Sequence, residues 1–158
     1  MRVFNLVIMI WVICGCSSVR VISEYEPAAD FSAYSTFNFV QVEKPVVALS
    51  PFMHLLNQRR IEYAITAEMG MRDYILSNKP DLRISYGIEP ASGNKPIEDG
   101  TLWVKITDSR TSQPVWSGRV KGALEDVTGE PTEALEEAIR ALFARYPYLA
   151  ARKERFGE

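Results

Sequence analysis

The chain has 158 residues, a size that favours a single domain, and 47% of them are apolar, enough to bury a core. Its formal net charge is -2. Because no excess of basic residues is available to neutralise phosphates, the composition excludes nucleic acid as an expected partner.

The N-terminal segment has the layout of an export signal. One cation, Arg2, precedes an apolar run over residues 3–13 that only Asn5 interrupts. A membrane-spanning helix needs about 20 apolar residues, and this run reaches roughly half that length before Gly15. We therefore expect residues 1–15 to be a signal peptide and not a membrane span.

The only two cysteines, Cys14 and Cys16, stand at the end of this apolar run. Their C-x-C spacing differs from the C-x-x-C of a thioredoxin-like redox site, and a structural zinc site would need further Cys or His ligands nearby. The single histidine, His54, is far along the chain. The sequence therefore predicts no metal site and no cofactor.

Residues 13–16 run from an aliphatic Ile13 through Cys14 and a small Gly15 to Cys16. This segment resembles the lipobox of bacterial lipoproteins. The resemblance implies that the thiol of Cys16 takes a diacylglyceryl group and that the signal is cleaved between Gly15 and Cys16. Two or three acyl chains anchor a protein firmly, whereas one holds it only marginally. Residues 16–18 would then form a lipidated N-terminus and a short tether.

The residue after Cys16 is Ser17 and not Asp, which resembles the outer-membrane sorting class of Gram-negative lipoproteins. The expected location is the outer membrane, facing the periplasm, or the extracytoplasmic face of the cell membrane if the host has one membrane. The first expected partner is therefore the membrane itself, through the anchor. The alternative is that both cysteines lie in an ordinary secretory signal or an N-terminal anchor helix.

Residues 19–42 predict two short strands around a turn. Val21 and Tyr25 alternate with polar neighbours, and Phe37 and Phe39 give the second strand an aromatic bias. We expect these strands to form a hairpin or a β-arch.

Two amphipathic helices are predicted, one over 51–71 and one over 131–146. The first has an apolar stripe with three- and four-residue spacing, and Gly70 is a plausible stop. In the second, Pro131 suits the first helical turn. The stripe residues are Ile61, Ala64, Ile65 and Met69 in the first helix, and Leu135, Ala138, Ile139, Leu142 and Tyr146 in the second.

Three further strands, over 81–88, 101–107 and 115–124, are predicted between the helices from alternating apolar residues. The last two are joined by a short, turn-rich segment and so are expected to form an antiparallel hairpin. In the strand from Asp81, Arg83 and Ser85 make one face polar.

Residues 19–147 are therefore expected to form one α+β domain in the order β-β-α-β-β-β-α. The predicted fold is a mainly antiparallel sheet of about five strands with both helices packed on one face. Residues 148–158 are expected to be a charged, solvated tail.

Several short motifs follow the lipobox. In one of them Asp30 is expected to cap a turn while Phe31 enters the core. In their order and spacing the motifs resemble the lipoproteins of "domain of unknown function 4136", a family that implies an α+β envelope domain with no established catalytic residue or cofactor. The motifs are Tyr25, Glu26-Pro27, Asp30-Phe31, Tyr34, Thr36-Phe37, Phe39, Pro80-Asp81-Leu82, Gly100-Thr101-Leu102, Asp108, Val115-Trp116-Ser117-Gly118 and Tyr146-Pro147.

No catalytic constellation stands out in the sequence. A triad would have to use His54, but no nucleophile-elbow pattern surrounds a serine. Paired acids, either among Glu24, Glu26 and Asp30 or Glu98 with Asp99, could act on peptidoglycan only at a defined separation. We therefore expect a non-catalytic binding or structural domain, or an accessory lipoprotein of an envelope transport or assembly complex. A cell-wall or lipid hydrolase is the alternative from another class.

The candidate partner surface consists of Trp103 and Lys105. Alternation places Trp103 on the strand face opposite Leu102, Val104 and Ile106. Either Trp103 is packed in the core or at an edge, or it is exposed beside Lys105 and marks the surface that binds an envelope protein partner.

Overall fold

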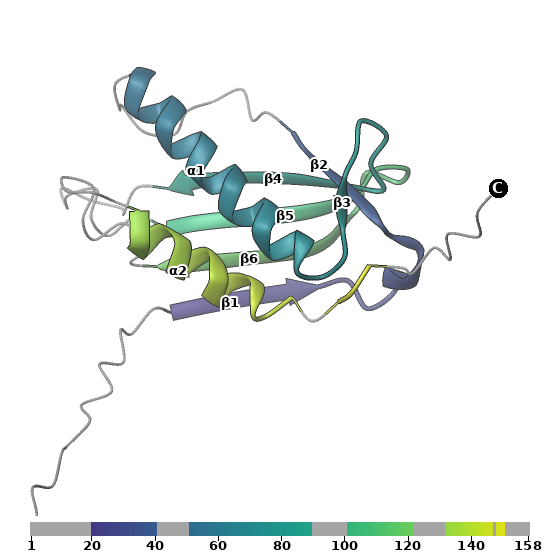
Figure 1. The fold of residues 1–158 in the computed structure, drawn as a ribbon. Helices are drawn as coiled ribbons and strands as arrows, with labels where there is room; N and C mark the ends of the chain where they lie inside the picture. Colours follow the sequence, from purple (N-terminus) through teal and green to yellow (C-terminus); the bar gives the residue numbers. More distant parts are fainter. Residues whose placement is uncertain (1–19, 41–50, 90–100, 122–131, 147, 151–158) are drawn as a thin grey trace, which may run out of the picture.

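The computed structural model describes residues 20–40, 51–89, 101–121, 132–146 and 148–150, without the side chains of 51–57, 132 and 133. Figure 1 shows one sheet with two helices on the same face, so the expected α+β class is confirmed. In chain order the elements are β1 (Arg20–Tyr25), a 3-10 turn η1 (Phe31–Ala33), β2 (Thr36–Phe39), α1 (Pro51–Gly70), β3 (Ile75–Leu76), β4 (Leu82–Glu89), β5 (Thr101–Asp108), β6 (Pro114–Lys121) and α2 (Thr132–Phe143).

The sheet has six strands in the order β1-β6-β5-β4-β2-β3. The pairs β1/β6, β6/β5 and β5/β4 are antiparallel, whereas β4/β2 and β2/β3 are parallel. The prediction of about five mainly antiparallel strands therefore needs correcting to a mixed sheet of six. The additional strand, β3, has only two residues, too few to produce a periodic pattern.

The first two strands do not pair with each other, so a hairpin over 19–42 is wrong. β1 lies at one edge of the sheet beside β6, and β2 inserts between β3 and β4 near the other edge. The predicted hairpin of β5 and β6 is confirmed, with a register irregularity beside Ile106. Between β1 and β2 the chain therefore crosses from one edge of the sheet to a position near the other edge.

The core lies between the helices and the sheet. The predicted stripe residues of both helices are buried, as are the alternate strand residues Leu82, Ile84, Leu102, Val104 and Ile106. In Figure 1, α1 crosses in front of β4 and β5, and α2 lies over β6 and β1. Neither described helix is long and apolar enough to cross a membrane.

The interior leaves no room for a side chain at Gly118. A Cβ there would lie 2.6 Å from Cδ1 of Leu142 and 2.7 Å from the ring of Trp116. Trp116 is only 2% exposed, and its ring packs against Phe143 and Tyr146. The space that a side chain at Gly118 would need is therefore filled by Leu142 and Trp116.

Arg72 ties the two helices together. Its Nε donates to the carbonyl of Tyr146 at 3.0 Å, Nη2 donates to that of Phe143 at 2.6 Å, and Nη1 donates to Oε2 of buried Glu68 at 2.9 Å. It thereby satisfies carbonyls that the end of α2 leaves without helical partners.

Packing continues past residue 147, where the predicted domain ends. The ring of Tyr148 stacks on that of Phe31, with centroids 3.5 Å apart, and the backbone N–H of Ala150 donates to the carbonyl of Arg72 at 2.9 Å. Residues 148–150 therefore belong to the packed domain.

Candidate functional site

The sheet face away from the helices, here called the open face, carries the polar half of each strand's alternation. Trp103 and Lys105 lie on it together, because both alternate with the buried residues of β5. The charged residues of the open face are Arg20, Glu24, Arg83, Glu89, Lys105, Arg119 and Lys121, from β1, β4, β5 and β6.

Trp103 sits near the middle of the open face. Sheet register pairs it with Gly87 on one side and Arg119 on the other, and Arg119 pairs in turn with Ile22. A Cβ on Gly87 would lie 2.7 Å from Cζ2 of Trp103, so the indole lies directly over Gly87. Neither described helix covers Trp103, which is half-buried, while Ile22 is 49% exposed. The two predicted alternatives thus combine: Trp103 packs on the neighbouring strand and keeps an accessible edge.

The open face is basic although the chain is acidic. Its five cations are all exposed, and none of them makes an ion pair within the described part of the chain. Against two acids they give this face a formal charge of +3, whereas the whole chain carries -2. The charges of the domain are therefore segregated, with the excess of acids elsewhere.

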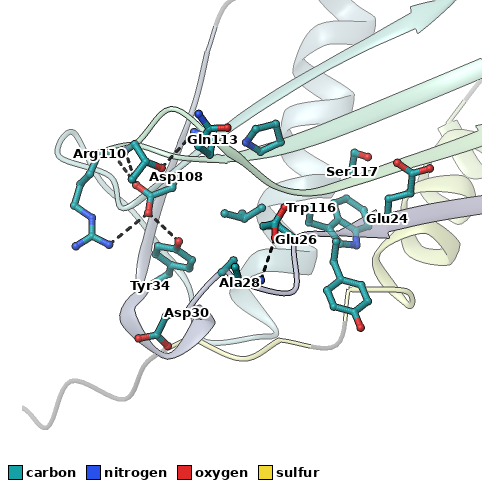
Figure 2. A pocket seen from close by; sticks show the side chains of 15 residues that line it. Glu24, Glu26, Ala28, Asp30, Tyr34, Asp108, Arg110, Gln113, Trp116 and Ser117 are labelled. Atoms are coloured by element: carbon teal, nitrogen blue, oxygen red, sulfur yellow. Dashed lines mark hydrogen bonds and ion pairs between the residues drawn. The ribbon is translucent and has the colours of Figure 1, made fainter.

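A cleft of about 640 Å³ lies at the end of the sheet where β1 stops and β5 turns into β6 (Figure 2). Its lining brings together four carboxylates, those of Glu24, Glu26, Asp30 and Asp108. No described lining residue is a histidine or a cysteine. Glu24, Glu26 and Asp30 were candidate acids in the sequence, but their grouping with Asp108 was not predicted, because the walls of the cleft come from segments about 80 residues apart in the chain.

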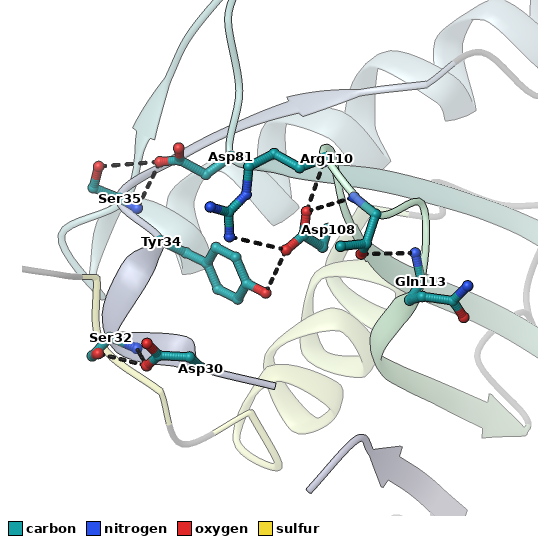
Figure 3. Close-up of polar contacts among 9 residues, drawn as sticks. Asp30, Ser32, Tyr34, Ser35, Asp81, Asp108, Arg110 and Gln113 are labelled. Carbon is teal, nitrogen blue, oxygen red and sulfur yellow. Dashed lines mark hydrogen bonds and ion pairs between the residues drawn. The ribbon is translucent and has the colours of Figure 1, made fainter. Parts of the chain in front are cut away.

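Within the described part of the chain, Asp108 accepts the most hydrogen bonds of the four cleft carboxylates (Figure 3). Its Oδ1 accepts hydrogen bonds from the backbone N–H groups of Arg110 at 2.6 Å and Thr111 at 3.1 Å. Its Oδ2 accepts one from the hydroxyl of Tyr34 at 2.8 Å and a longer one from the Arg110 guanidinium at 3.4 Å. These contacts fasten the β5–β6 turn to the residue that follows η1.

The same contacts set the proton affinity of both partners. Burial works to raise the pKa of Asp108, but the hydrogen bonds from Arg110, Tyr34 and Thr111 outweigh it and hold that pKa below its ordinary value of 3.8. Burial and the Asp108 carboxylate raise the pKa of Tyr34 to about 12. Asp108 therefore stays ionised and Tyr34 stays neutral near pH 7, so neither is poised to exchange a proton.

Two other acids of the cleft cap their own turns. Oε1 of Glu26 accepts the backbone N–H of Ala28 at 3.1 Å, and Oδ1 of Asp30 accepts that of Ser32 at 3.1 Å. The predicted roles of Asp30 as a turn cap and of Phe31 as a core contact are confirmed. Among the described residues, no three His, Cys, Asp or Glu side chains are grouped so that they could hold a metal ion.

Several of the motif residues quoted from the sequence contact one another and stabilise the fold. Oδ2 of Asp81 accepts the backbone N–H groups of Ser35 and Thr36, both at 3.0 Å, and also their hydroxyls. Tyr34 binds Asp108 as described, and Trp116 packs on Tyr146. These motif residues therefore join β2 to β4, join the segment before β2 to the end of β5, and pack β6 against the segment that follows α2.

Other residues singled out in the sequence lie beyond the part of the chain that the structure describes. Gly15 and Cys16 lie outside the described residues, as do Glu98 and Asp99. His54 belongs to α1, but its side chain is not among those described.

These features define an α+β domain with one helix-covered and one open sheet face. The chain belongs to the family described as "Domain of unknown function (DUF4136)", which it matches over residues 21–148. The expected family is thereby confirmed. A comparison with curated proteins gives no match.

Two solved structures are similar to this chain at low sequence identity. A PDZ domain protein from Parabacteroides distasonis is 18% identical, with a TM-score of 0.55 over 82% of this chain, which spans only 36% of that protein. The PelC dodecamer of Paraburkholderia phytofirmans, in one crystal form, is 14% identical, with a TM-score of 0.44 over 80% of this chain and 92% of its own. The first likeness supports the fold alone.

Proposed function

We propose that this protein is a lipid-anchored, non-catalytic domain of the bacterial cell envelope that binds its partner through the open face. The observation that carries the proposal is the position of Trp103, half-buried at the centre of a basic sheet face that neither described helix covers. Large aromatic side chains with an accessible edge are frequent anchors of binding surfaces.

The anchor part of the proposal rests on the lipobox-like segment that ends at Cys16. The location that goes with it is the outer membrane, facing the periplasm, because Ser17 follows the cysteine. Removal of residues 1–15 would leave a chain without a pair of cysteines, so the mature domain would depend on its core alone for stability, even in an oxidising compartment.

The non-catalytic part of the proposal is supported by the hydrogen bonds of the carboxylates that line the cleft. Asp108, Glu26 and Asp30 each accept hydrogen bonds that fix the backbone around them. The pKa of Asp108 is held low by its hydrogen bonds, whereas a general acid of a glycosidase needs a raised one.

The anchor is tested by labelling cells with a fatty acid analogue and separating membranes. Cys16→Ala is expected to abolish both labelling and membrane retention, and the matched Cys14→Ala is expected to leave both unchanged. Equal labelling of the Cys16→Ala chain would overturn the anchor.

The binding surface is tested with a photoreactive amino acid placed at residue 103 and, as the control, at Arg59, an exposed residue of α1 on the other layer. Irradiation of intact envelopes should give an adduct with either a protein or a lipid from residue 103 and none from residue 59. If neither position gives an adduct, or both give the same ones, the open face is not the binding surface.

The hydrolase alternative makes a contrasting prediction for the purified protein. It requires turnover of peptidoglycan or phospholipid that Glu26→Gln or Asp30→Asn abolishes. The proposal expects no turnover above that of the buffer, and turnover that depends on either acid would contradict it.

A further inference from the structure

We infer that the partner of the open face is the anionic lipid surface to which the protein is itself anchored. The inference rests on the proposed lipid anchor and names the chemistry that the open face recognises. Three observations carry it: the length of the tether, the charge of the face and the side chains at its centre.

The tether is too short to let the domain leave the membrane surface. β1 begins at Arg20, four residues after Cys16. Since an extended chain gains at most about 3.6 Å per residue, the start of β1 stays within about 14 Å of the lipidated cysteine. Arg20 itself belongs to the open face, through its pairing with Lys121. The end of this face therefore lies beside the headgroups whatever the orientation of the rest.

The charge of the open face is complementary to anionic headgroups. Its five exposed cations outnumber its two acids and make no ion pairs within the described strands and helices. Attraction to a charged bilayer is felt within about one Debye length, roughly 10 Å at moderate salt. The tether keeps the nearest cations, Arg20 and Lys121, at about this distance, so the field acts on a face that is already close.

The centre of the open face suits the boundary between water and hydrocarbon. Trp103 has an apolar ring with one polar N–H, the composition that favours membrane interfaces. Ile22, two positions away in the same cross-strand row, is 49% exposed, and Arg119 lies between them. A protein partner could use Trp103 equally well, but it would not account for five exposed cations beside a short lipid tether.

The test uses the lipidated protein reconstituted in vesicles of phosphatidylcholine, alone or mixed equally with phosphatidylglycerol, whose acyl chains carry bromine. The chain from Cys16 onward has two tryptophans, Trp103 and Trp116, and bromine quenches only an indole that touches the acyl chains. Trp116 is 2% exposed on the other side of the sheet and serves as an internal reference.

Docking predicts that Trp103 emission is quenched in the anionic vesicles, is quenched less in the neutral ones, and recovers at high salt. Trp103→Phe should remove the quenchable emission. Lys105→Gln with Arg119→Gln is expected to lower the ratio of docked to undocked protein about 25-fold, since each cation near an anionic surface contributes about fivefold. The matched control, Arg59→Gln on α1, should change nothing, and circular dichroism checks that each variant is folded.

The outcomes separate this inference from the proposed function. If the protein carries no fatty acid and does not float with the vesicles, the anchor fails and the docking fails with it. If it floats but Trp103 is quenched equally little in both lipids, the anchor stands and docking on lipid is overturned. A protein adduct from residue 103 in intact envelopes, without lipid quenching, would assign the open face to a protein partner.

Discussion

The two faces of the sheet each hold one tryptophan, and the surroundings of the two residues differ. Trp116 packs against Phe143 and Tyr146 under α2, and its ring occupies the space that Gly118 leaves. Trp103 lies over Gly87 with an accessible edge and exposed cations around it. The helix-covered face is thus held by interlocked apolar packing, whereas the open face contributes little to the core. We therefore expect the binding surface on the open face, because its side chains contribute little to core packing.

The largest expected difference between the faces concerns the tryptophans themselves. Trp116→Ala leaves a cavity in the core and should lower the free energy of unfolding by about 3–5 kcal/mol. Trp103→Ala removes partly exposed area and should cost about 1 kcal/mol. Urea denaturation of both variants measures the two values. Equal losses would mean that the open face is part of the core.

The next comparison is between two arginines. Arg72→Met removes the guanidinium that pairs with buried Glu68 and donates to the carbonyls of Phe143 and Tyr146, so the expected loss is about 3 kcal/mol. Arg119→Met, on the open face, should change stability by less than about 0.5 kcal/mol. Thermal and urea unfolding should agree, and a large loss at Arg119 would indicate a structural ion pair there.

The two glycines that face tryptophans give a smaller and more specific contrast. Gly118→Ala forces a Cβ against Leu142 and Trp116, both buried, and should cost about 2 kcal/mol. Gly87→Ala meets the Trp103 ring at a similar distance, but that ring can swing toward solvent, so less than about 1 kcal/mol is expected. A red shift of Trp103 emission in Gly87→Ala would report the swing, and its absence together with a large loss would contradict it.

The smallest effect compares two acids and depends on pH. Asp108→Asn removes the charged acceptor of Tyr34 and Arg110 and should cost about 1.5 kcal/mol near neutral pH. Glu89→Gln on the open face should cost less than about 0.5 kcal/mol.

The sign of this pH dependence follows from the lowered pKa of Asp108. Because the folded pKa lies below the ordinary value of 3.8, the stability that the carboxylate contributes is present above that value. It is lost as the pH falls through the folded pKa. The gap between wild type and Asp108→Asn should therefore shrink in acid, as followed by urea unfolding across pH. A difference in stability that widens in acid would contradict the lowered pKa of Asp108.

Local elements were predictable because their signals lie within a few residues. The stripe from Ile61 to Met69 and the alternation from Leu82 to Ile88 each placed apolar side chains on one side of an element, and the core uses them in that way. Alternation within β5 likewise puts Trp103 and Lys105 together on the face opposite its buried residues. Periodicity therefore indicates which side of each element is apolar.

The joins between elements could not be predicted, since they depend on contacts distant in the chain. The hydroxyl of Tyr34 meets Asp108 across 74 residues, and Asp81 reaches Ser35 across 46. The parallel pairing of β2 with β4 depends on such long-range contacts. The hairpin expected over 19–42 does not form, because β1 pairs with β6 and β2 pairs with β4. The cleft is lined by the same distant segments, so no local sequence pattern predicts it.

By itself, the sequence determined the family, the α+β class and the apolar side of each helix and strand. It also predicts the export and lipidation signals that the labelling test checks. Only the tertiary structure decided the order of the six strands, which face the helices cover and therefore which face stays open. The physical reason is that one side chain's exposure depends on which distant element packs over it, and no local pattern encodes that choice. Trp103 was an ambiguous residue in a strand until the position of α1 and α2 left it on the open face.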